Sequence, residues 1–243
     1  MLIKLFYGRP ENQNIEAIID QYPDGCINSI QTSILPLLDY WKKTELVIQK
    51  LMAEMSLEAI NPKICFEYPT PSYKNNRASM TDIMVEDKQY KIAIEAKYRE
   101  VEQKAQTVSD WFSPKTENRQ KVLEHWIKCI NPFLITPLEI ESIFNIPYQF
   151  LHRVASACYS NDGVAVVLYQ LFYDDKIKGK MEKYKETISD SICLFTTTKN
   201  LRFYTHEIKV ELLKTNVKYQ NALQYIKSSS LYSFHDENIC RSA

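Results

Sequence analysis

The spacing of apolar residues in the first third of the chain predicts a strand followed by two helices. Residues 2–7 have the composition of a short strand, and residues 12–22 predict a short helix before a turn at Pro23-Asp24-Gly25. From about residue 33 to residue 60, apolar side chains recur at helical spacing. We therefore expect one long helix there, with Pro36 in its first turn and Asn61-Pro62 at its end.

The period then changes to that of strands. Residues 64–68 predict one strand, residues 82–85 predict a second, and residues 90–97 predict a third. Four polar residues at 86–89 separate the last two strands, which predicts a β-hairpin. The polar residues 72–77 predict a loop between the first two strands.

The second half of the chain predicts more helices and strands around a strongly apolar segment. Residues 98–116 read as a polar loop that carries Trp111 and Phe112, and a basic connection follows at 176–185. The tail at 229–243 reads as weakly structured. The expected helices are 117–130, 138–158 and 216–228, and the expected strands are 164–172, 191–197 and 201–210. With no repeat or linker visible, residues 1–243 read as a single domain.

Glycine usage excludes several classes of enzyme. The chain has four glycines, and their positions cannot build a P-loop, a dinucleotide-binding motif or the nucleophile elbow of α/β-hydrolases. No apolar run is long enough to cross a membrane, and the first residues are too quickly polar for a signal peptide. Six scattered cysteines without metal-ligand spacing predict reduced and mostly buried thiols in a cytoplasmic protein.

Charge narrows the choice of partners less sharply. The 30 basic and 30 acidic residues cancel, so bulk charge does not predict polyanion binding, although a local basic cleft stays open. The lysine-rich residues 176–185 are either a solvated connection or a contact for phosphates. Trp111 and Phe112 either stack on a base or anchor their loop by apolar packing. Tyr73, Lys74 and Arg77 precede the second strand and could form a wall of a cleft.

The most informative residues lie on the predicted hairpin. Because side chains alternate along a strand, Glu95 and Lys97 share one face, and hairpin pairing brings Asp82 close to Glu95. Two neighbouring carboxylates repel unless a proton or a cation stands between them. Mg²⁺ binds one or two carboxylates and keeps several waters, and an adjacent lysine can orient or deprotonate a water activated by the ion. This set of groups suits phosphodiester hydrolysis.

The pattern Asp82-x12-Glu95-x-Lys97 resembles the PD-(D/E)XK nuclease superfamily, which has the restriction-endonuclease-like fold. The expected element order also resembles its αβββαβ core: the long helix, strands at 64–68, 81–85 and 91–97, helix 117–130 and strand 164–172. The resemblance covers about residues 35–172, with residues 1–34 and 173–243 as additions. It implies an α/β (α+β) fold with a mixed sheet flanked by helices. Thr81 departs from the motif, which has Pro at that position.

The resemblance also implies roles for individual residues. Asp82 and Glu95, with the backbone carbonyl of Ala96, would hold Mg²⁺ or Mn²⁺, and Lys97 would position the attacking water. A further acid would come from the first helix, as Glu45 or else Glu54, or from the first strand, as Glu67. Gln120 on the following helix could also face the site.

Three functions compete at this stage. The first is a metal-dependent endonuclease that acts on nucleic acid, DNA in particular, in restriction, defence or repair. A homodimer would be compatible with it, because cutting both strands often needs two active sites. The second is a nucleic-acid-binding or assembly protein that keeps the fold without catalysis. The third is a protein-interaction module in which Glu95 and Lys97 form a plain salt bridge.

Overall fold

In a computed structural model of the chain, which describes residues 2–23, 32–73, 78–214 and 216–242, eight strands form one sheet. Across the sheet the strands run in the order β2-β1-β3-β4-β5-β6-β7-β8. Their bounds are β1 Lys4–Tyr7, β2 Glu11–Asn12, β3 Lys63–Thr70, β4 Ser79–Asp87, β5 Tyr90–Lys97, β6 Val164–Tyr173, β7 Leu201–Leu212 and β8 Tyr232–Ser242.

The sheet is mixed, and the direction of each pairing follows from the connection between the strands. β3, β4 and β5 form an antiparallel meander joined by short connections. β5, β6 and β7 run parallel to one another, and each parallel step returns through helices, as parallel pairs require. β1 pairs parallel to β3, whereas β2 and β8 form antiparallel edges. The most apolar strands, β5 and β6, therefore lie in the interior of the sheet.

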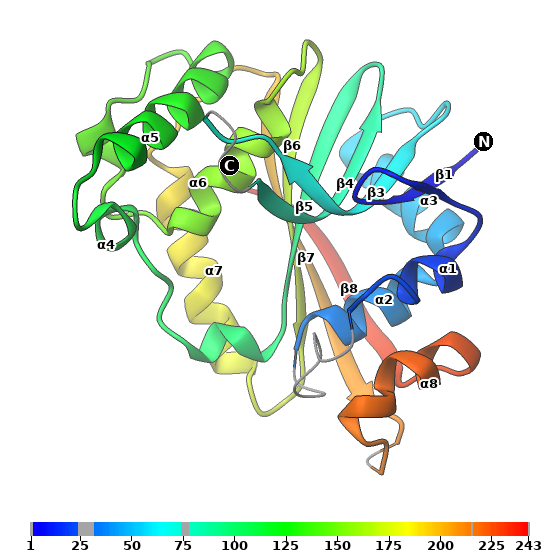
Figure 1. Cartoon of the computed structure of the whole chain (residues 1–243). Helices are drawn as coiled ribbons and strands as arrows, with labels where there is room; N and C mark the ends of the chain where they lie inside the picture. The colour runs from blue at the N-terminus through cyan, green and yellow to red at the C-terminus, as the bar shows by residue number, and fades with distance from the viewer. Residues whose placement is uncertain (1, 24–31, 74–77, 215, 243) are drawn as a thin grey trace.

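Helices cover both faces of the sheet (Figure 1). The group α4 to α7 lies on one face, where Phe150 of α6 stacks on Tyr169 of β6. Gln170 follows Tyr169 on β6, so its side chain points to the opposite face of the sheet. There it accepts a hydrogen bond from Trp41 of α2. The helix bounds are α1 Ile15–Ile19, α2 Ile34–Trp41, α3 Thr44–Met55, α4 Val108–Phe112, α5 Glu117–Ile130, α6 Tyr148–Cys158, α7 Lys178–Ile192 and α8 Ala222–Ser228.

Several predicted elements are confirmed. The hairpin is formed by β4 and β5, and the predicted bounds 90–97 and 117–130 agree with β5 and α5. Strands also occupy most of the segments predicted at 2–7, 64–68, 164–172 and 201–210. The helices at 12–22, 138–158 and 216–228 are present but shorter than predicted. The mixed sheet flanked by helices agrees with the expected fold class.

Other predictions are wrong. The helix expected at 33–60 is two helices, since the backbone leaves the helical region at Lys43 and α3 ends at Ser56 in a left-handed conformation. The basic connection at 176–185 is largely the start of α7, and no strand forms at 191–197 among the described residues. The tail at 229–243 contains β8, which pairs with β7 along most of its length.

The turn predicted at Pro23-Asp24-Gly25 begins in the described residues, but residues 24 and 25 lie outside them. The described cysteines are all free thiols, and Cys26 lies outside the described residues. Within the described part of the chain, no helix is both long enough and apolar enough to cross a bilayer.

Candidate functional site

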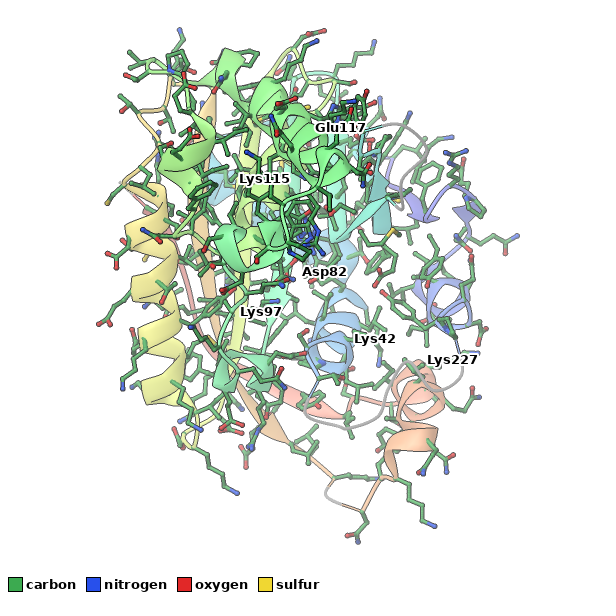
Figure 2. The ribbon with its side chains drawn as sticks, turned by 60° about the vertical axis from the view of Figure 1, so that its left-hand side comes forward. Lys42, Asp82, Lys97, Lys115, Glu117 and Lys227 are labelled. Carbon is green, nitrogen blue, oxygen red and sulfur yellow. The ribbon has the colours of Figure 1, made fainter. Side chains whose placement is uncertain are left out.

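Asp82 and Glu95 face each other where the ladder between β4 and β5 ends. The last pair of the ladder is Ile83 with Ile94, so one step further along both strands Asp82 lies opposite Glu95. Beyond that pair, Oδ2 of Asp82 accepts a 2.7 Å hydrogen bond from the backbone N–H of Ala96. The Asp82 side chain thus accepts a hydrogen bond from the backbone of the partner strand, β5. Figure 2 shows Asp82 and Lys97 close together on the face that α4 to α7 cover.

Glu95 is the most enclosed member of the site, with 1% of its surface exposed. One carboxylate oxygen, Oε1, accepts from Lys97 Nζ and from Gln149 Nε2, and the other, Oε2, accepts from Arg153 Nε. Two cations and an amide thus satisfy this buried carboxylate. A charge at this depth would otherwise be costly.

Arg153 connects the two carboxylates from α6. It lies four residues after Gln149, so both side chains leave the same face of the helix. Its Nη2 lies 3.6 Å from Oδ1 of Asp82, while its Nε binds Glu95. Its Nη1 lies 3.5 Å from the Thr81 hydroxyl and 3.1 Å from Nδ1 of His152. Arg153 is itself only 3% exposed, so the guanidinium is a fixed part of the site.

The two carboxyl groups differ in their titration. Burial, reinforced by the nearby Glu95 charge, raises the pKa of Asp82 to about 7. Burial also acts to raise the pKa of Glu95, but Arg153 and Lys97 outweigh it and hold that pKa below the ordinary value. Burial acts to lower the pKa of Lys97, and the Glu95 charge outweighs it, so that pKa is raised. Glu95 is therefore a stable carboxylate at neutral pH, whereas Asp82 is close to its midpoint.

Glu67 on β3 is the third acid of the site. Its backbone has a positive φ of 49°, and it lies between the pairs Phe66–Ile83 and Tyr68–Thr81, across from Asp82. Burial raises the pKa of Glu67; the charge of Arg153 opposes this rise and that of Glu95 reinforces it. The structure thus brings together four of the residues singled out in the sequence: Asp82, Glu95, Lys97 and, from the first strand, Glu67.

The acids expected on the first helix lie elsewhere. Glu45 and Glu54 belong to α3, which packs on the opposite face of the sheet, and both are exposed. Gln120 lies on α5 and donates a hydrogen bond of 2.9 Å to Glu124, and among the described residues its side chain forms no hydrogen bond with the carboxylates of the site. The helix that faces the site is α6, which follows α5 in the chain. From the sequence, residues 117–130, which form α5, were expected to face the site. The side chains that bind Glu95 come instead from α6, the next α-helix in the chain.

The structure also places the two aromatic residues of the segment predicted as a polar loop. Trp111 stacks on Tyr148 with ring centroids 4.2 Å apart, and Phe112 is buried, so both anchor the segment that contains α4. Lys74 and Arg77 lie outside the described residues.

Four residues of the site were missed in the sequence: Gln149, Arg153, Tyr169 and Tyr184. The first two had a signal, since a glutamine and an arginine at i and i+4 lie on one face of a helix whose other residues are mostly apolar. Tyr169 of β6 and Tyr184 of α7 interact electrostatically with Glu95, Arg153 and Asp82. The Tyr169 hydroxyl is buried and has no hydrogen-bond partner among the described residues.

The donors at this site fit a hard divalent cation. Within the described residues, no group of three or more His, Cys, Asp or Glu side chains is arranged to hold a metal. Mg²⁺ needs only one or two carboxylates, because waters complete its coordination. Asp82 has this capacity: its side chain is 26% exposed, and among the described residues the one polar contact of its Oδ1 is with Arg153, at 3.6 Å.

The fold and the site define a mixed α/β protein with a buried cluster of carboxylates and cations at one end of its sheet. The chain belongs to the family described as Domain of unknown function (DUF6946), whose model matches residues 13–220. No curated protein and no solved structure matches the chain.

Proposed function

We propose that this protein is a metal-dependent nuclease that hydrolyses phosphodiester bonds, with DNA as its substrate and an endonuclease mode of cutting. The observation that carries the proposal is the meeting of Asp82, Glu95 and Lys97 at one end of the sheet, where the Asp82 carboxyl is partly exposed and has Arg153 only at 3.6 Å among the described cations. The order of helix α3, strands β3 to β5, covering helices and parallel strand β6 supports a restriction-endonuclease-like core.

Each residue of the site has a role in this proposal. Asp82 and Glu95, with the Ala96 carbonyl, would hold Mg²⁺ or Mn²⁺, which supplies water activation and charge neutralisation when bound. Lys97 is fixed by Glu95, remains protonated and is 12% exposed at its side chain, so it can orient a water and offset charge growing on a phosphate. Arg153 and Gln149 hold the Glu95 carboxylate in one orientation.

The test is cleavage of supercoiled plasmid DNA, and of single-stranded circular DNA in the same assay, by the wild-type protein and by Lys97→Ala, with Lys128→Ala as an exposed control on α5. Wild type and Lys128→Ala should cut equally in Mg²⁺ or Mn²⁺ and stop with a chelator. Lys97→Ala should lose about 10²–10³ in rate, the typical effect of removing one electrostatic stabiliser. Equal cutting by all three proteins would show that the activity does not come from this site.

A second candidate function is nucleic-acid binding or assembly without catalysis. The observation that favours it is that both oxygens of Glu95 already bind side chains of the chain itself, Arg153 above all. In that case Asp82→Asn and Lys97→Ala would leave nucleic-acid binding unchanged, and no metal would produce cleavage.

A further inference from the structure

A basic groove lies beside the carboxylate cluster. It has a volume of about 470 Å³ and is formed between the segment 101–107, the residues before α6 and the outer face of α7. Its cations are Lys104, Lys180 and Lys183, and its one acid is Glu102, which pairs with Lys180. Lys104 and Lys183 are exposed and form no ion pair with any described residue. The groove therefore presents two exposed positive charges to an anion, of which Lys104 also acts on the Asp110 carboxylate.

Tyr184 connects this groove to the site. It lines the groove, and its phenol interacts electrostatically with Lys97 and Glu95. Pro147, at another point of the lining, immediately precedes the helix whose Gln149 binds Glu95. A polyanion seated in the groove would thus have a neighbouring phosphate close to Lys97.

We propose that this groove binds the sugar–phosphate backbone of a single DNA strand next to the scissile phosphate. The inference rests on the proposed nuclease function and adds the form of its substrate. Glu95 and Lys97 are recessed, with 1% and 12% of their side chains exposed, so the strand must enter the protein rather than lie across a flat face. A volume of about 470 Å³ is within the range of pockets for groups the size of small ligands. It accommodates a nucleotide, and basic grooves are how single strands are commonly tracked.

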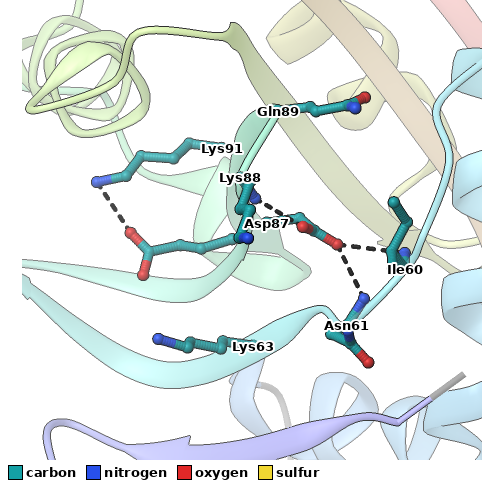
Figure 3. Close-up of a pocket in the computed structure, with 8 residues that line it drawn as sticks. Ile60, Asn61, Lys63, Asp87, Lys88, Gln89 and Lys91 are labelled. Atoms are coloured by element: carbon teal, nitrogen blue, oxygen red, sulfur yellow. Dashed lines mark hydrogen bonds and ion pairs between the residues drawn. The ribbon is translucent and has the colours of Figure 1, made fainter.

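The chain offers a matched control at the turn between β4 and β5, which is the end of these two strands away from Asp82 and Lys97. A second hollow of about 520 Å³ is lined by Lys63, Lys88 and Lys91, of which Lys91 pairs with Glu86 (Figure 3). Lys63 and Lys88 are exposed, as Lys104 and Lys183 are. Six residue steps along β5 separate Lys91 from Lys97, a distance on the order of 20 Å. Lys104→Ala/Lys183→Ala and Lys63→Ala/Lys88→Ala therefore change the net charge equally at two distant places.

The experiment measures fluorescence anisotropy of a labelled 12-nucleotide single strand, and of a duplex of the same sequence, with wild type and both double variants. It is run in Ca²⁺ without Mg²⁺ across a range of salt concentrations, and melting curves confirm that each variant is folded. For the single strand, Lys104→Ala/Lys183→Ala should bind more weakly, and the slope of log affinity against log salt should fall in magnitude by about 1.4, or 0.7 for each phosphate that a removed lysine had neutralised. Lys63→Ala/Lys88→Ala should match wild type.

The outcomes separate this inference from the proposed function. Equal weakening in both double variants, or no weakening in either, would overturn the groove and leave the nuclease proposal to the plasmid assay. An equal loss for the duplex would overturn the single-strand assignment. If only the groove variant weakens while the wild-type protein cuts no DNA, the groove stands as a binding site and the nuclease proposal fails.

Discussion

Replacing Asp82 by asparagine should stabilise the metal-free protein at alkaline pH, although the residue belongs to the candidate site. The folded chain raises the pKa of Asp82 from 3.8 to about 7, because burial and Glu95 disfavour its charge. This rise corresponds to about 4 kcal/mol, at 1.36 kcal/mol for each pH interval of one. Asparagine has nearly the same shape without the charge. It keeps an oxygen for the Ala96 N–H but weakens that hydrogen bond, which leaves a net gain of about 2 kcal/mol.

The sign of the pH dependence follows from the direction of the shift. Because the folded pKa is raised, the stability that Asp82 contributes is complete below about pH 4 and is lost as the pH rises to about 7. Relative to wild type, Asp82→Asn should therefore be about 1 kcal/mol less stable at pH 5 and about 2 kcal/mol more stable at pH 8, a change of about 3 kcal/mol. For a chain of this length, a net gain of about 2 kcal/mol corresponds to about 4–8 °C in melting temperature.

The assay is urea denaturation and thermal melting at pH 5 and pH 8, without metal and with millimolar Mn²⁺. Asp162→Asn is the matched control, since Asp162 is an exposed aspartate in the connection to β6. In Mn²⁺ at pH 8 the wild type should gain stability by mass action, by about 2.7 kcal/mol at a hundredfold excess over Kd, and Asp82→Asn should gain none. Equal destabilisation of Asp82→Asn at both pH values would refute the unfavourable charge, and an unchanged wild-type melting curve in Mn²⁺ would refute the metal site.

Two further predictions concern packing and the buried ion pair. Gly163→Ala should destabilise the protein by about 1–3 kcal/mol, because its Cβ would lie 2.1 Å from the backbone oxygen of Gln89. Gly179→Ala in α7 has open space around it and should stabilise by up to about 1 kcal/mol; equal urea midpoints for the two variants would contradict this. Arg153→Met should cost about 3–5 kcal/mol by removing the main partner of buried Glu95, and a cost near zero in urea denaturation would show that the pair is not formed.

The elements that the sequence predicted well are those whose pattern is local. β5 is a short, mostly apolar run that follows a polar turn, so its bounds could be predicted. Glu95 and Lys97 are two residues apart on it, so their common face could be predicted as well. In α7, a run of lysines conceals the buried Met181, Ile188 and Ile192. β8 is an edge strand with mostly exposed side chains, so it lacks the alternation of a half-buried strand.

The parts of the site that could not be predicted come from distant segments. Gln149 and Arg153 reach Glu95 from 54 and 58 residues away in the chain. The sequence places them on a helix but does not say which strand that helix covers. The prediction that Glu45 or Glu54 joins the site was wrong for a similar reason. Periodicity identifies a helix but not the face of the sheet against which it packs.

The balance of charge at the site separates a metal centre from a static ion-pair network. The described residues bring three carboxylates, Glu67, Asp82 and Glu95, against two cations, Lys97 and Arg153. Burial raises the pKa of Asp82 and of Glu67, and the charge of Glu95 adds to the rise at both. A purely structural network would be more stable without the extra negative charge, because an asparagine at position 82 would remove the repulsion. A divalent cation together with one phosphodiester group adds a single net positive charge, which brings the sum to zero. The surplus carboxylate is thus unfavourable in the metal-free protein and favourable in the proposed nuclease.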